Sequence, residues 1–266
     1  MLMPTCISAT AKRTVFLGLT LIMLLPLKAH AIDDRADTDP NDELDPGEKI
    51  AWKSTLSKYS DSLLGDAYDL NIRGNTEQLT FWLGHYSHAN VFKQTRLGVE
   101  YSHALPMGRL IGSVQVATEN FLGWSLTWDG KNAGQHGFGP LVGIGRTNLK
   151  PYYNLNFDPN DSVLIGGSYS SSRIGTLTLY KIADDRLHTG QQTMHLVWRR
   201  SLTEGRRLTV DAFSRKGASE SGEAVYRGTG AMVTLDINDW FMRLGYDPKA
   251  NWGPSNIVRM AIGFRH

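Results

Sequence analysis

The strict alternation of apolar and polar side chains constrains this chain more than any other feature of its sequence. Near the end of the chain every second side chain is large and apolar, as in Val258, Met260, Ile262 and Phe264. Successive side chains of an extended backbone point to opposite faces. A period of two therefore predicts strands with one oily face and one polar face. The same pattern recurs in residues 194–199 and 240–247.

Further strands are predicted wherever this alternation returns between turn-forming residues such as Asp129-Gly130 and Asp247-Pro248. These runs cover residues 79–87, 96–105, 109–118, 122–128, 138–146, 149–157, 163–170, 175–182, 208–214 and 230–237. Together with the three runs above they make thirteen, and neighbours such as 109–118 and 122–128 can merge. One fold class considered below is the bacterial β-barrel, in which even numbers of strands are favoured, and for that fold we expect about 12 strands.

The first 31 residues have the composition of an export signal. Lys12 and Arg13 precede an apolar run over residues 14–27, and Ala29-His30-Ala31 offers a cleavage site between small residues. This order is typical of a secretory signal peptide, and the run is shorter than the ~20 residues that span a bilayer. The only cysteine, Cys6, lies in this segment. The exported chain therefore has neither a disulfide framework nor a cysteine-based zinc site.

Two segments separate the signal from the predicted sheet. Residues 32–47 are rich in Asp and Glu, and we expect a disordered acidic leader there. Residues 48–74 are predicted to form an amphipathic helix and a connector. In this segment an apolar stripe at i, i+4, i+7 and i+11 consists of Trp52, Leu56, Tyr59 and Leu63. Such a helix either rests on a membrane surface or covers one end of the fold.

Composition and hydropathy leave two fold classes for residues 75–266. The chain is 41% hydrophobic and has a formal charge of +2, which argues against a disordered protein and a dedicated nucleic-acid binder. No window after the signal is apolar enough for a helical membrane span. An exported chain of alternating strands is then either a soluble lectin-like sandwich, with its apolar face inside, or an outer-membrane barrel, with its apolar face toward lipid.

Several features favour the barrel in the outer membrane. Strands of about 10 residues suit a tilted span, and Trp or Tyr recurs at the ends of apolar runs as in an aromatic girdle. The last strand, with Phe264 near its end, resembles the closing strand of bacterial outer-membrane proteins. We therefore predict an all-β fold, an antiparallel transmembrane β-barrel of about 12 strands with a short N-terminal amphipathic helix.

In such a barrel the polar faces line the lumen. The ionisable side chains on these faces are Glu100, Arg109, His195, Arg199, Arg207, Asp211, Asp236, Arg243, Asp247, Arg259 and Arg265. Confined charges must be paired, so a narrow lumen largely filled by ion pairs is predicted. Because arginine exceeds carboxylate, any passage left would prefer anions. The function predicted from these features is a non-enzymatic narrow pore or an envelope component that presents loops.

A second functional interpretation comes from His85-Tyr86-Ser87-His88. His85 and Ser87 share the apolar face of a strand, which we take to be the first and to run outward, so both face lipid near the outer leaflet. Residues 85–100 resemble the His-x-Ser-Asn-Ala motif of the lipid A 3-O-deacylases, which are outer-membrane barrels. The resemblance implies an esterase for lipid A or phospholipid with Ser87 as nucleophile, His85 as base and Glu100 as the carboxylate that orients it. Alternation, however, turns Glu100 toward the lumen.

No cofactor is expected from the sequence. His85, His88 and His103 lack a recognised metal-ligand spacing, and Gly143-Ile144-Gly145 lacks the helix that a dinucleotide-binding loop requires. The expected partners are outer-membrane lipids, including lipopolysaccharide, and no nucleic acid. The sequence does not determine the oligomeric state.

Overall fold

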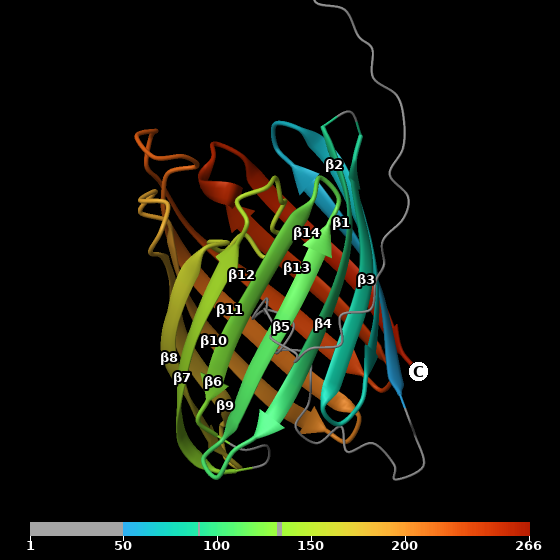
Figure 1. Ribbon diagram of the computed structural model, residues 1–266. Coiled ribbons are helices and arrows are strands. Elements are labelled where there is room, and N and C mark those ends of the chain that lie inside the picture. Colours follow the sequence, from blue (N-terminus) through green and yellow to red (C-terminus); the bar gives the residue numbers. More distant parts are fainter. Residues whose placement is uncertain (1–49, 90, 132–134) are drawn as a thin grey trace, which may run out of the picture.

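The computed structural model describes residues 50–89, 91–131 and 135–266 (Figure 1). The predicted signal peptide, residues 1–31, and the predicted acidic leader, residues 32–47, lie outside the described residues.

Fourteen antiparallel strands form a single closed barrel. Each strand pairs with its neighbours in the sequence, and β1 pairs with β14 to close the ring (Figure 1). The strands are β1 (Ala51–Asp61), β2 (Gly65–Asn75), β3 (Leu79–His88), β4 (Phe92–Ala104), β5 (Arg109–Ala117), β6 (Phe121–Asp129), β7 (Gly137–Thr147), β8 (Ser162–Ser171), β9 (Gly175–Asp184), β10 (Gln192–Thr203), β11 (Arg206–Gly217), β12 (Tyr226–Ile237), β13 (Trp240–Pro248) and β14 (Asn256–Arg265). One short 3-10 helix, η2 (Ala250–Trp252), lies between β13 and β14.

The barrel begins at Ala51, so the helix expected within residues 48–74 is wrong: this segment forms β1 and β2. Trp52 and Leu56 are four residues apart, a spacing that keeps two side chains on one face of a helix and also on one face of a strand. Tyr59 falls on the opposite face of β1, where it is 2% exposed inside the barrel. Because this aromatic ring packs inside the lumen, apolar residues lie on both faces of β1. Their spacing therefore matches the 3.6-residue period of a helix although the segment is a strand.

A second correction concerns residues 149–157, which were expected to form a strand and belong instead to the connection between β7 and β8. The other twelve expected runs are strands, and β1 and β2 bring the number to 14 rather than about 12. Leu149 and Phe157 both have φ of 59°, which interrupts an extended chain at each end of the segment.

The two ends of the barrel differ in the length of their connections. At one end lie the connections 148–161, 185–191, 218–225 and 249–255; at the other end several are as short as 172–174, 204–205 and 238–239. Bacterial barrels have short periplasmic turns and longer extracellular loops. We therefore call the end with the longer connections the outer end.

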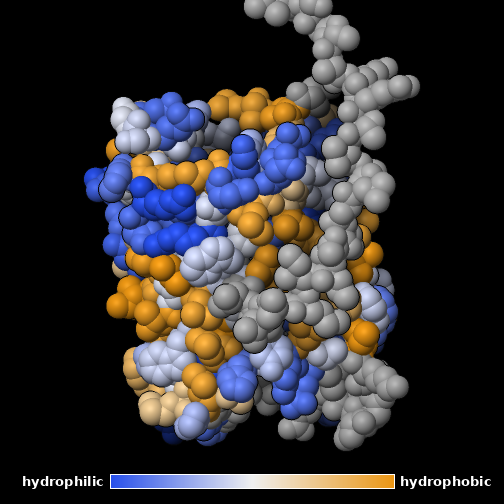
Figure 2. Space-filling model, in the orientation of Figure 1, coloured by the Kyte–Doolittle hydropathy of each residue, from blue (hydrophilic) through white to orange (hydrophobic). Residues whose placement is uncertain are grey.

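The outward faces of the strands are apolar. Leu70, Leu83, Leu196, Leu244 and Ile262 are each 45% exposed or more, although all are large and hydrophobic. Hydrophobic residues gather across the middle of the face seen in Figure 2, with hydrophilic residues above and below this band. Among the described residues, helices offer no stretch that is both long and apolar enough to cross a membrane. The closed ring excludes the two-sheet sandwich, and its exposed apolar belt is the surface that a lipid bilayer covers.

Candidate functional site

The lumen contains buried ion pairs that join different strands, most of them two strands apart in the ring. Arg96 Nη2 lies 2.7 Å from Asp69 Oδ1, and Arg215 Nη2 lies 3.0 Å from Asp247 Oδ1. Asp236 accepts hydrogen bonds from Arg207 Nε at 3.1 Å and from Arg265 Nη2 at 2.6 Å. Burial of a charge is tolerated when an opposite charge satisfies it. These pairs therefore explain how so many charged groups fit inside a narrow ring.

Cations in the lumen also lie over aromatic rings. Lys53 Nζ is 4.6 Å and the Arg265 guanidinium 5.3 Å from the centre of the Phe241 ring. The Arg73 guanidinium lies 5.4 Å from the Trp82 ring, on the neighbouring strand. Such contacts are favourable and fill space between the strands. This part of the lumen is packed with side chains.

The longest connection, residues 148–161, folds into the barrel from the outer end; we call it the inward loop. Phe157 is 0% exposed and Leu155 is 7% exposed, within a cluster that includes Tyr59, Tyr86 and Ile257 of the wall. Loops normally run over the surface because buried backbone needs partners. Here the Tyr153 backbone N–H donates to Gln94 Oε1 at 2.8 Å, which satisfies one such group.

The inward loop contacts strands that are far apart around the barrel. On one side the Tyr152 ring stacks on Phe121 of β6 with ring centres 4.1 Å apart, and Gln115 of β5 donates to the Tyr152 hydroxyl. Farther around the ring, Asp158 Oδ1 lies 3.2 Å from His195 Nε2 of β10, and the centre of the Phe157 ring lies 6.4 Å from that of Tyr59 on β1. The loop therefore crosses the lumen.

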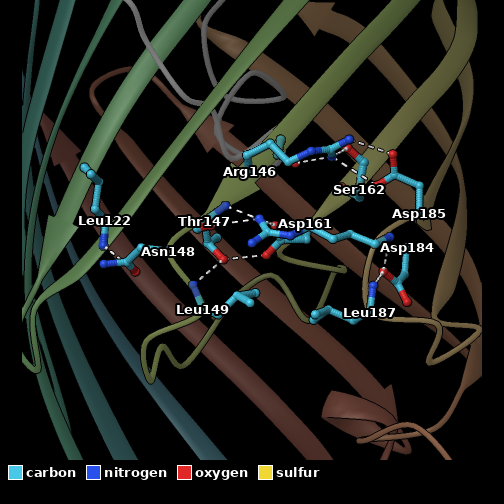
Figure 3. A network of polar contacts seen from close by, with 12 residues as sticks. Leu122, Arg146, Thr147, Asn148, Leu149, Asp161, Ser162, Asp184, Asp185 and Leu187 are labelled. Atoms are coloured by element: carbon cyan, nitrogen blue, oxygen red, sulfur yellow. Dashed lines mark hydrogen bonds and ion pairs between the residues drawn. The ribbon is translucent and has the colours of Figure 1, made fainter.

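The base of the inward loop is tied to the connection between β9 and β10 (Figure 3). Asp161 accepts hydrogen bonds from the Thr147 backbone N–H at 3.1 Å, from the Thr147 hydroxyl and from Arg186 Nη1 at 2.7 Å. Arg146 makes two parallel bonds to Asp185, at 3.0 and 2.7 Å. Fork-shaped pairs of this kind fix geometry as well as charge. The loop therefore leaves the barrel rim in a defined direction.

An open cavity remains between the inward loop and β5–β9. Its wall residues include Ser125 and Thr127 of β6, Gly143 and Gly145 of β7 and Ser162 of β8. The loop contributes Tyr152, Asn154, Asn156, Asp158, Pro159 and Asn160. Small side chains on the wall leave this space open, in contrast to the packed side of the lumen.

The lumen is thus divided into two walls. The inward faces of β10–β14 and β1–β4 form what we call the charged wall, and those of β5–β9 form the neutral wall. The neutral wall carries small uncharged residues such as Ser113, Ser125 and Thr127, each 5% exposed or less. Its charged residues include the pair Arg109–Asp129, with Nη2 3.4 Å from Oδ2.

The structure places the residues expected in the lumen as follows. His195, Arg207, Asp211, Asp236, Arg243, Asp247 and Arg259 are all buried. His195 Nδ1 lies 3.0 Å from Asp211 Oδ2, and Arg243 Nε donates to Thr234 Oγ1 at 3.1 Å. Arg199 is half-buried on β10, opposite Thr176 and Thr209.

The esterase residues are not brought together. His85 and Ser87 lie on the outward face of β3, the third strand rather than the first, and His85 Nδ1 is 2.9 Å from Thr95 Oγ1. Glu100 is half-buried on β4 and pairs in register with Thr80, five residues from His85 along β3. It also lies on the other face of the sheet. The role of Glu100 in orienting His85 is therefore not supported by the geometry.

The inward loop is the feature that sequence reasoning missed. Tyr153, Leu155 and Phe157 alternate with Asn154 and Asn156, which is the pattern of a strand. In the structure the apolar set packs on the aromatic cluster inside the barrel instead of facing lipid. Pro151, which cannot donate to a strand ladder, was the signal against a central strand.

No protein family profile matches this chain, and no curated protein matches it in sequence. Among solved structures, the outer membrane protein Omp33 of Acinetobacter baumannii matches 83% of this chain with 100% of its own, at a TM-score of 0.53 and 8% identity. The chain has the fold of a bacterial outer-membrane β-barrel. OprD from Pseudomonas aeruginosa is also similar, with 86% of this chain and 97% of that chain covered, at a TM-score of 0.43 and 9% identity. At these identities the likeness concerns the fold.

Proposed function

We propose that this protein is a narrow, non-enzymatic pore of the outer membrane in which the inward loop forms the constriction. The observation that carries this proposal is the open cavity between that loop and the neutral wall. A loop that only filled the barrel would leave no such space. Here one side of the lumen is packed by ion pairs and aromatic rings, and the proposed passage lies on the other side.

The position of the passage changes the expected selectivity. The arginine excess in the sequence predicted a preference for anions. In the structure Arg96, Arg207, Arg215 and Arg265 each pair with an aspartate on the charged wall, away from the cavity. Paired charges contribute a weak field at a distance. The proposed pore therefore discriminates little by charge sign.

Single-channel recording in planar bilayers tests the proposal. The wild type should give small, discrete current steps. A variant in which residues 150–159 are replaced by a short Gly-Ser linker keeps Thr147 and Asp161 at the loop base and should conduct several times more, because the constriction is removed. As a matched control, deletion of the exposed residues 220–223 between β11 and β12 should leave the conductance unchanged. The absence of current steps in both the wild type and the shortened variant would overturn the proposal.

An esterase remains the second candidate, because His85 and Ser87 do share the outward face of a strand that runs toward the outer end. The hydrogen bond between His85 and Thr95 and the inward position of Glu100 argue against it. Mass spectrometry of lipid A from cells that express the wild type or Ser87→Ala decides between the two. The pore proposal expects identical acyl patterns; loss of an acyl chain only with the wild type would favour the esterase.

We also infer that lipopolysaccharide is the lipid neighbour of the barrel at its outer end. Lys216 of β11 and Arg227 of β12 are register partners, exposed on the outward face beside the outer connections. Like charges directly opposite each other on paired strands repel. A phosphate group of lipid A between them would remove this repulsion, which a zwitterionic lipid does less well.

A further inference from the structure

We propose that the cavity beside the inward loop is a binding and transit site for small, uncharged, hydroxyl-rich solutes such as sugars. This inference rests on the proposed pore function and adds the class of solute. It is drawn from the chemistry of the cavity lining, which differs from that of the rest of the lumen.

Of the 20 residues that line the cavity, nine carry uncharged amide or hydroxyl side chains and only two are charged. The nine are Gln115, Ser125, Thr127, Thr147, Tyr152, Asn154, Asn156, Asn160 and Ser162. Side-chain amides and hydroxyls both donate and accept hydrogen bonds, as sugar hydroxyls do. A surface of this kind can replace the hydration shell of a sugar without supplying a net charge.

The two charged residues in the lining, Arg146 and Asp158, are engaged elsewhere. Both terminal nitrogens of Arg146 bind the Asp185 carboxylate at the loop base. Asp158 Oδ1 lies against His195 on the charged wall. Neither side chain therefore has to be matched by a charge on the solute, which argues against an ionic ligand.

The cavity also has an apolar surface. Phe121 and Tyr152 are stacked with ring centres 4.1 Å apart and an angle of 17° between their planes, and both line the cavity. Leu164 and Ile182 line it as well. A sugar ring has C–H faces as well as hydroxyl edges, so it fits a cavity that offers both kinds of surface. A small inorganic ion would gain nothing from the apolar part.

Asn154 and Asn156 of the inward loop differ in the hydrogen bonds that their side chains make within the loop. Asn154 donates to the Asp158 carbonyl at 2.8 Å and to Asn160 Oδ1 at 2.9 Å, and it accepts from the Asn156 backbone N–H. Its side chain therefore holds the loop in shape. Asn156 contributes its backbone to this arrangement, and its side chain is the one we expect to contact a solute.

Permeation into liposomes that contain the purified full barrel tests the solute class. Glucose and glucuronate share a pyranose ring and differ at C6, where glucuronate carries a charged carboxylate in place of a hydroxymethyl group. We expect glucose to enter several times faster than glucuronate. Equal rates, or faster entry of glucuronate, would overturn the inference.

Binding is tested by adding sucrose to the single-channel recording. We expect a concentration-dependent block of the ion current. Asn156→Ala removes one hydrogen-bonding side chain and should weaken this block roughly two- to tenfold, the range for loss of a single hydrogen bond. Asn71→Ala, the same substitution on β2 of the charged wall, should leave the block unchanged.

The two proposals fail differently. Without current steps the pore itself is wrong, and the solute site falls with it. Current steps that sucrose leaves unchanged, in wild type and variants alike, would overturn the solute site and leave the pore standing.

Discussion

Buried charges decide which single substitutions this barrel tolerates. Arg96 and Asp69 lie on different strands, and their side chains are only 8% and 5% exposed. Removing one partner leaves the other charge buried without its counterion, which typically costs about 3–5 kcal/mol, whereas replacing both by apolar residues is often neutral.

We therefore expect Asp69→Leu to lower the free energy of unfolding by about 3–5 kcal/mol, and Asp69→Leu with Arg96→Met to recover most of the loss. Urea titration in detergent, followed by tryptophan fluorescence, measures both variants. If the double variant were as unstable as the single one, the pair would contribute through packing rather than charge.

Asp158 is the residue through which the inward loop contacts His195. Asp158→Ala should free the tip of the loop while its base stays tied by Asp161. We expect the mean conductance to change little and rapid current fluctuations to increase, as seen in single-channel traces. Asp185→Ala serves for comparison, because it loosens the base of the inward loop instead of its tip. If Asp158→Ala gave no more current fluctuations than the wild type, aromatic packing alone would fix the tip.

At the scale of elements, the sequence predicted strands well where lipid and lumen impose different demands on alternate residues. The alternation of residues 258–265 is of this kind, and β14 has the predicted faces, with Met260 exposed and Arg259 buried. The prediction from alternation was wrong where apolar side chains pack inside the lumen. Tyr59 inside β1 suggested a helix, and Leu155 and Phe157 in the inward loop suggested a strand. Single-sequence patterns report burial, and they do not distinguish burial in lipid from burial in a plugged barrel.

The outward pair Lys216 and Arg227 tests the contact between β11–β12 and the outer leaflet. Replacing both by serine should reduce several-fold the lipopolysaccharide that remains bound after purification, as measured by phosphate analysis and gel staining. Arg200→Ser, an exposed change on β10 near the opposite end, is the matched control and should have no effect. Equal retention by all three proteins would remove the proposed phosphate site.

For the whole molecule, the sequence predicted the class of fold and the direction of both faces, since these follow from alternation and export. It did not predict the division of the lumen, because that depends on where a 14-residue connection packs after the ring has closed. His195 illustrates the difference. Its inward direction follows from alternation on β10, whereas its contact with Asp158 joins residues 37 positions apart.

A fractionation experiment tests the orientation of the whole barrel. Wild-type protein should sediment with outer membranes. Introduction of Arg at Leu83 or Leu244, both in the apolar belt, should destabilise the inserted barrel by about 2–4 kcal/mol at the bilayer midplane and less toward the interfaces. Ser113→Thr, a small change inside the lumen, should leave membrane recovery intact. Recovery of the wild type in the aqueous fraction would contradict the membrane orientation.

The tie at Asp161 makes the tip of the inward loop a replaceable part. Because the rim contacts of Thr147, Arg146 and Arg186 lie outside the segment that crosses the lumen, a different peptide could be grafted between them without disturbing ring closure. Such a graft would set the width of the passage through the barrel and the chemistry of its lining by means of one short segment. This barrel is therefore a compact scaffold for nanopore sensing.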